Sequence, residues 1–145
     1  YYPTLFLRRN FAEINGLIMS DVALYSSRMS QYKIIHNPHC SKSREALDLL
    51  QKNGIEPEII DYLNDGLSLG LLESTIQALQ MKPREILRTK EDDYKVLQIN
   101  LDNDKEVIRA IMACPRLLER PIVIKGHKAL VARPPEKVLE LIATP

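Results

Sequence analysis

The side chains best suited to chemistry lie in residues 36–44, His-Asn-Pro-His-Cys-Ser-Lys-Ser-Arg. Cys40 separates a short apolar run from an amphipathic run, which predicts that its sulfur lies at the N-terminus of a helix. The free backbone N–H groups and the dipole of such a helix stabilise a thiolate, and Lys42 and Arg44 add positive charge. The same groups attract anions. We therefore expect a nucleophilic thiolate inside an anion-binding site.

Neighbouring polar side chains favour the same interpretation. Ser41 and Ser43 can donate hydrogen bonds to the sulfur, and His36, at the end of the preceding strand, can approach it as a cation. The alternative for Cys40 is a small buried apolar residue, but the polar and charged neighbours on both sides argue against it. His36 is equally compatible with simply ending a strand. His39 is expected in the solvated part of the loop.

A second thiol is missing where a dithiol oxidoreductase needs it, because the Cys-x-x-Ser pattern places Ser43 at that position. The pattern predicts a monothiol mechanism whose second thiol comes from another molecule, with glutathione the obvious candidate. Cys114 lies among apolar residues at a predicted helix end and is expected to be a packing residue. Two cysteines in unlike contexts also indicate a reducing, cytoplasmic compartment.

Composition restricts the class of protein. The chain has 145 residues, is 45% hydrophobic and 27% charged, and carries a formal net charge of +1. These values suit one globular domain and give no electrostatic argument for nucleic-acid binding. No apolar run approaches the roughly 18 residues of a membrane span. We expect a single domain over residues 30–145, preceded by an N-terminal extension, residues 1–29, that is flexible or not native.

Local patterns predict the elements that position Cys40. Residues 32–36 are β-prone and end at an Asn-Pro pair, which favours a turn. Residues 41–53 carry apolar side chains on one helical face, and Asn53-Gly54 supplies a left-handed stop. Residues 58–63 read as a second strand. This β-α-β unit should hold two parallel strands joined by a right-handed crossover.

The rest of the chain predicts a helical insertion followed by a hairpin. Residues 68–114 contain apolar spacings of three and four, with Ser68 as a helix cap. Two β-prone runs, 121–125 and 128–132, flank Gly126-His127 and predict an antiparallel hairpin. A closing helix begins after two prolines and is expected to turn inward Val138, Leu139 and Ile142. The order β-α-β, helical insertion, β-β-α describes an α/β protein with a thioredoxin-like, four-stranded mixed sheet.

Three arginines stand at element boundaries outside the loop: Arg88, Arg120 and Arg133. The simplest interpretation makes them solvated surface charges. However, Arg120-Pro121 opens the third strand, where a thioredoxin-like fold presents a cis-proline beside its active cysteine, so the Arg120 side chain can face Cys40. A guanidinium remains charged and binds two oxygens at once, which suits a tetrahedral oxyanion.

Four ordered motifs within residues 32–142 resemble the glutaredoxin-dependent arsenate reductases. They are His-Asn-Pro-x-Cys-x-x-Ser-Arg at 36–44, Ile86-Leu87-Arg88, Glu119-Arg120-Pro121-Ile122-Val123 and Arg133-Pro134-Pro135-Glu136. Residues 1–29 lie outside the resemblance. Several motifs in the same order with similar spacing are far more specific than one.

The resemblance implies a role for each matching residue. Cys40 would be the nucleophile that attacks arsenate, His36 would help to keep it as a thiolate, and Arg88, Arg120 and Arg133 would bind the oxyanion. A covalent cysteine–arsenic(V) adduct would form with loss of water. Glutathione and glutaredoxin would be the external reductants that release arsenite, with no metal and no bound cofactor.

Two alternatives stay open. The Spx-type branch of the same fold binds RNA polymerase instead of reducing a substrate, but Ser43 and the Arg-Pro-Pro-Glu motif at 133–136 favour the reductase branch. A monothiol reductase acting on another oxyanion or on glutathionylated proteins would use the same Cys40, because the expected site recognises charge and tetrahedral shape.

Overall fold

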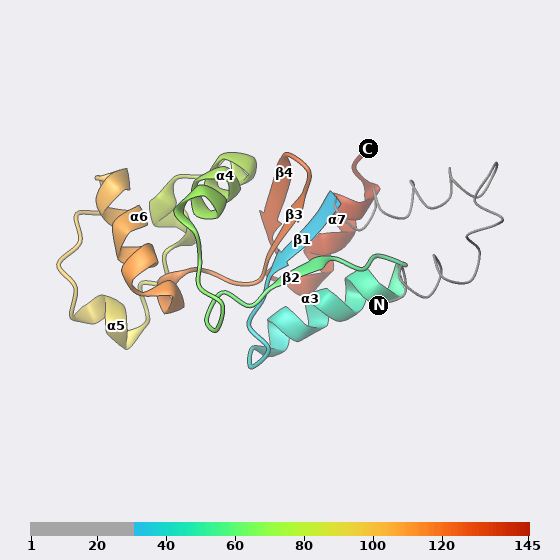
Figure 1. Ribbon diagram of the computed structural model, residues 1–145, viewed down its shortest axis with the longest axis horizontal. Coiled ribbons are helices and arrows are strands. Elements are labelled where there is room, and N and C mark those ends of the chain that lie inside the picture. Colours follow the sequence, from blue (N-terminus) through green and yellow to red (C-terminus); the bar gives the residue numbers. More distant parts are fainter. Residues whose placement is uncertain (1–30) are drawn as a thin grey trace, which may run out of the picture.

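The core of the protein is a mixed four-stranded sheet. The computed structural model describes residues 31–145, so the expected extension over residues 1–29 lies outside the described residues. Strand β1 (Tyr32–Ile35) pairs in parallel with β2 (Glu58–Ile60) and antiparallel with β3 (Ile122–Lys125). Strand β4 (Lys128–Val131) completes the order β2-β1-β3-β4 (Figure 1). The expected mixed sheet is confirmed.

Helix α3 (Ser41–Lys52) connects the two parallel strands. It begins immediately after Cys40, which is its N-cap residue in an extended conformation. Asn53 forms the C-cap and Gly54 follows with φ of 75°, a left-handed conformation that costs glycine little. The helix therefore starts and stops where the sequence predicts, and it carries Cys40 at its N-terminal end.

The predicted second strand is shorter than expected. It ends at Ile60, because the backbone N–H groups of Asn64 and Asp65 both donate to the carbonyl of Asp61 and turn the chain. Residues 61–63 consequently leave the sheet. Tyr62 is fully buried in the apolar core instead of alternating along a strand.

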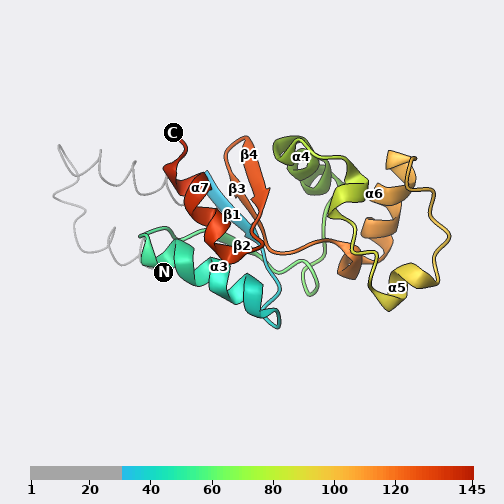
Figure 2. The ribbon, with the colours of Figure 1, turned by 180° about the vertical axis from the view of Figure 1, so that it is seen from behind.

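A helical segment separates the β-α-β unit from the hairpin and extends away from the sheet (Figures 1 and 2). Ser68 caps its first helix through a 3.1 Å hydrogen bond from the Leu71 N–H, as predicted. The segment comprises α4 (Leu69–Leu79), the 3₁₀ turn η2 (Pro83–Ile86), α5 (Asp92–Lys95), α6 (Asp104–Ala113) and the 3₁₀ turn η3 (Pro115–Leu117). No helix within residues 31–145 is long and apolar enough to cross a membrane.

Apolar side chains cover both faces of the sheet. On one face, Ile34 and Val123 pack with buried residues of α3 and of the closing helix α7 (Val138–Ala143), which follows the 3₁₀ turn η4 (Pro135–Lys137). On the other face, Ile35 and Ile122 pack with the helical segment. The inward face of α7 was predicted wrongly in one position: Leu139 is 44% exposed, whereas Leu141 is buried.

Candidate active site

The loop before α3 is held in place by polar groups of the helix itself. The Ser43 hydroxyl oxygen accepts a 3.0 Å hydrogen bond from the Asn37 N–H, and Nη1 of Arg44 donates to the Pro38 carbonyl at 2.9 Å. The Cys40 N–H donates to the Asn37 carbonyl at 3.0 Å. Ser43 is completely buried, so this hydroxyl supports the loop from within.

Cys40 is partly exposed and has an acidic thiol. Burial alone would raise its pKa, but the backbone N–H groups of Ser43 and Lys42 and the guanidinium of Arg120 outweigh burial and lower the pKa below its ordinary value. The expectation of a stabilised thiolate agrees with this geometry. The hydrogen bond comes from the backbone of Ser43, however, whereas the serine hydroxyl serves the loop, and Ser41 is exposed.

His36 directly follows Ile35, the last residue of β1, and differs from the expected cation. It is only 6% exposed, and burial together with the charge of Arg44 lowers its pKa, although Asp61 acts in the opposite direction. A neutral imidazole is therefore favoured at pH 7. Its Nδ1 atom is buried and has no hydrogen-bond partner among residues 31–145.

Arg120 meets the Cys40 loop because of the strand register. Ile35, the last residue of β1, pairs with Ile122, the first residue of β3. The chain after β1 and the chain before β3 therefore lie at the same end of these two neighbouring strands. The Arg120-Pro121 peptide bond is cis, as expected, and a second cis bond joins Arg133 to Pro134. Of the three predicted arginines, Arg120 is the one whose charge acts on the Cys40 thiol.

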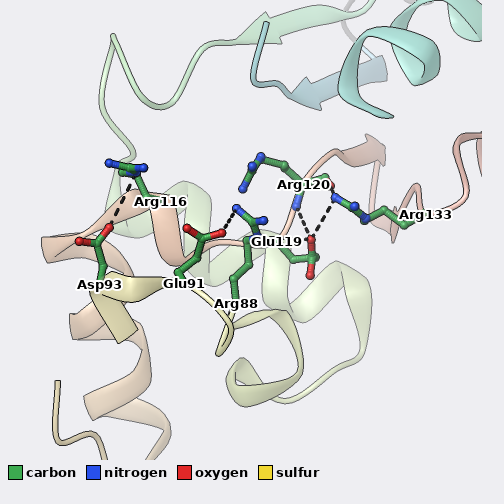
Figure 3. A network of polar contacts seen from close by, with 7 residues as sticks. All are labelled: Arg88, Glu91, Asp93, Arg116, Glu119, Arg120 and Arg133. Atoms are coloured by element: carbon green, nitrogen blue, oxygen red, sulfur yellow. Dashed lines mark hydrogen bonds and ion pairs between the residues drawn. The ribbon is translucent and has the colours of Figure 1, made fainter. Parts of the chain in front are cut away.

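Glu119 brings the three arginines together (Figure 3). One of its carboxylate oxygens lies 3.5 Å from Nη1 of Arg133 and 3.9 Å from Nε of Arg88, and it accepts a 3.2 Å hydrogen bond from the backbone N–H of Arg120. Arg88 also forms a 2.7 Å ion pair with Glu91, while Nη1 of Arg133 donates to the Arg120 carbonyl at 3.0 Å. Arg88 and Arg133 thus face carboxylates in this structure.

Two backbone arrangements place these side chains together. An isolated antiparallel bridge joins Leu87 to Leu118, so that Arg88 lies beside the segment that carries Glu119. The Ala132 N–H donates to the Pro121 carbonyl at 2.9 Å, which brings the end of β4 alongside the start of β3. The side chains of Arg88 and Arg133 therefore meet at Glu119, directly before Arg120 in the chain, and the role of the three arginines in binding an oxyanion stays a prediction.

Sequence reasoning gave no role to two residues of this region. Glu119 adjoins the recognised Arg-Pro pair, and a carboxylate directly before an expected anion-binding arginine was the available signal. Tyr62 was assigned to a strand, yet its hydroxyl lies where the charges of Arg120 and Cys40 act on it.

A separate cavity of about 700 Å³ lies between α4 and the hairpin turn. Its lining includes Lys33, Thr75 and His127 and none of the candidate site residues. It opens near the start of β1, whereas Cys40 follows the end of that strand. Within residues 31–145, no three His, Cys, Asp or Glu side chains are grouped so that they could hold a metal ion.

Comparisons with known proteins agree on one family. Residues 35–141 match the model of the ArsC family. The chain is 48% identical over 112 residues to an arsenate reductase of Haemophilus influenzae, covering 75% of this chain and 97% of that protein. It is 45% identical over 115 residues to the protein YfgD of Escherichia coli K12, covering 77% of this chain and 97% of that protein. The solved structure of an arsenate reductase from Vibrio cholerae superposes with a TM-score of 0.69 at 42% identity. The match covers 77% of this chain and 97% of that chain.

Proposed function

Because the chain belongs to the ArsC family, we propose that it is an arsenate reductase with Cys40 as its nucleophile and glutathione and glutaredoxin as its reductants. The observation that carries this proposal is the position of the Cys40 thiol, at the N-terminus of α3 and within the field of Arg120. A nucleophile and an anion-binding cation are then adjacent. Arsenate, a tetrahedral oxyanion, needs both.

In the first step, the Cys40 thiolate attacks arsenic and a sulfur–arsenic bond forms. One arsenic-bound oxygen takes up protons and leaves as water, so arsenic remains in the +5 state. Arg120 stabilises the negative charge of the oxygens beside the sulfur, and Arg88 and Arg133 complete the binding set. Ser41, Ser43 and Arg44 maintain the anion loop. The resemblance to the family also gives His36 a part in keeping the thiolate, and a neutral imidazole would act there as a hydrogen-bond donor.

In the second step, glutathione attacks the adduct and glutaredoxin resolves the resulting mixed species. The thiols of glutathione and glutaredoxin give up two electrons and form one mixed disulfide, while arsenic falls from +5 to +3. Water then breaks the sulfur–arsenic(III) bond, which releases arsenite and returns Cys40 as a thiol. Ser43 stands where a neighbouring thiol would be, which supports an external second thiol. These reductants belong to a reducing compartment, in agreement with the expected cytoplasmic location.

The test is arsenate-dependent oxidation of NADPH in an assay coupled through glutathione, glutaredoxin and glutathione reductase. Cys40→Ser should abolish turnover, whereas Cys114→Ser should retain most of it. Replacing glutaredoxin and glutathione by thioredoxin and its reductase should give little activity. Folded, reduced protein with no rate above background would reject the arsenate assignment, and equal loss in both cysteine variants would reject the monothiol scheme.

A further inference from the structure

Tyr62 is a buried polar residue that the mechanism above does not use. Its side chain is 0% exposed, and its hydroxyl has no hydrogen-bond partner among residues 31–145. A buried hydroxyl left without a partner costs about 1–3 kcal/mol, so natural proteins rarely retain one without a purpose. A phenylalanine would fill the same apolar space without this cost.

The hydroxyl shares its surroundings with the proposed nucleophile. The guanidinium of Arg120 lies near enough to both the Tyr62 hydroxyl and the Cys40 sulfur to act toward lowering their pKa values, although it makes no well-formed hydrogen bond to the hydroxyl. The charge of Cys40 also acts on Tyr62. The Nε atom of Arg120 is likewise buried without a hydrogen-bond partner in the described part of the chain. The Tyr62 hydroxyl, Nε of Arg120 and the Cys40 thiol therefore belong to one neighbourhood, in which the first two lack a well-formed hydrogen bond.

Both groups act as hydrogen-bond donors. Burial raises the pKa of Tyr62 to about 12, despite the opposing effect of Arg120, so the phenol keeps its proton near neutral pH. A guanidinium carries only donors. Donors gathered beside a nucleophile leave a place for an acceptor, and a tetrahedral oxyanion presents several acceptor oxygens.

We propose that Tyr62 is a substrate-binding residue, whose hydroxyl donates a hydrogen bond to an oxygen of the oxyanion held beside Cys40 while Nε of Arg120 donates to the same anion. This inference rests on the proposed function, because it places the anion at Cys40. Tyr62 transfers no proton in this role. Its contribution is to bind and orient the anion.

Tyr62→Phe tests the proposal, since it removes one oxygen atom and keeps the ring. Binding is measured by calorimetry with sodium arsenate in the Cys40→Ser background, where no sulfur–arsenic bond forms. We expect the dissociation constant to rise about tenfold or more, as for the loss of a hydrogen bond to a charged group. Without arsenate, the variant should melt at the same temperature or higher, because an unpartnered buried hydroxyl has been removed.

Tyr32→Phe is the matched control, because Tyr32 is also buried, at 5% exposed, but packs with the apolar residues of α3 and α7 on the other face of the sheet. It should leave arsenate affinity unchanged. Equal affinity with and without the Tyr62 hydroxyl would overturn the proposal, and so would a lower melting temperature of anion-free Tyr62→Phe, which would indicate a structural hydroxyl. Failure of the Cys40→Ser parent to bind arsenate would instead remove the proposed function, and this inference with it.

Discussion

Ser43→Ala should destabilise the protein through a single buried hydrogen bond. The Ser43 hydroxyl is 0% exposed and accepts the N–H of Asn37, which is itself only 8% exposed, at 3.0 Å. Alanine removes the acceptor and leaves a buried N–H without a partner, at a cost of about 1–3 kcal/mol. For a domain of this size, a loss of about 2 kcal/mol corresponds to a fall in Tm of roughly 6–12 °C.

The same substitution should affect Cys40. Asn37 anchors the turn that contains the Cys40 N–H. A looser loop would hold the thiol less firmly near the backbone N–H groups at the start of α3. The pKa of Cys40 should then rise toward its ordinary value, and its alkylation at pH 7 should slow.

Urea and thermal denaturation provide the assay, with Ser74→Ala as the matched control. The Ser74 hydroxyl also bonds a backbone group, the Leu71 carbonyl at 3.0 Å, but at an exposed position of α4. Its loss should change stability by no more than about 0.5 kcal/mol. Equal effects of the two substitutions would refute the assignment of Ser43 as the internal support of the loop.

Three further substitutions test the surrounding charges. Arg120→Lys keeps the charge but loses the planar fork, so kcat/KM for arsenate should fall about tenfold or more, and wild-type kinetics would remove Arg120 from the site. Burial lowers the pKa of His36 in the folded state, so as the pH falls below about 6.5 the unfolded chain takes up a proton that the folded chain does not yet bind. The free energy of unfolding should therefore decline in this pH range. His36→Gln should flatten that decline in pH-dependent urea denaturation, whereas substitution of the exposed His127 should not. Glu119→Gln should lower the free energy of unfolding by about 1 kcal/mol, because the carboxylate that faces two arginines is lost. Glu73→Gln, at an exposed position of α4, should be neutral in the same denaturation experiment.

Much of the fold follows from short-range sequence patterns. The Asn-Pro pair after β1, the Asn53-Gly54 stop and the Ser68 cap act on their immediate neighbours, and the structure places each as expected. The boundary of β2 was less predictable. Its β-prone run continues past Ile60, and the turn that ends it depends on backbone hydrogen bonds to Asp61.

The site was predictable in its components but not in their partners. Cys40, Arg88, Arg120 and Arg133 stand out by residue type and position. Glu119 contacts Arg88, which lies 31 positions earlier in the sequence, only because Leu87 and Leu118 form a bridge. Likewise, the neutral imidazole favoured at His36 depends on burial, which no local pattern specifies.

The most direct test of the account is the rate of Cys40 alkylation as a function of pH, measured in the Cys114→Ser protein with and without arsenate. We expect a thiolate inflection below the ordinary cysteine pKa of about 8.5, and protection of the thiol when arsenate occupies the arginine site. An inflection at the ordinary value, together with an alkylation rate that arsenate does not change, would contradict an activated nucleophile inside an oxyanion site.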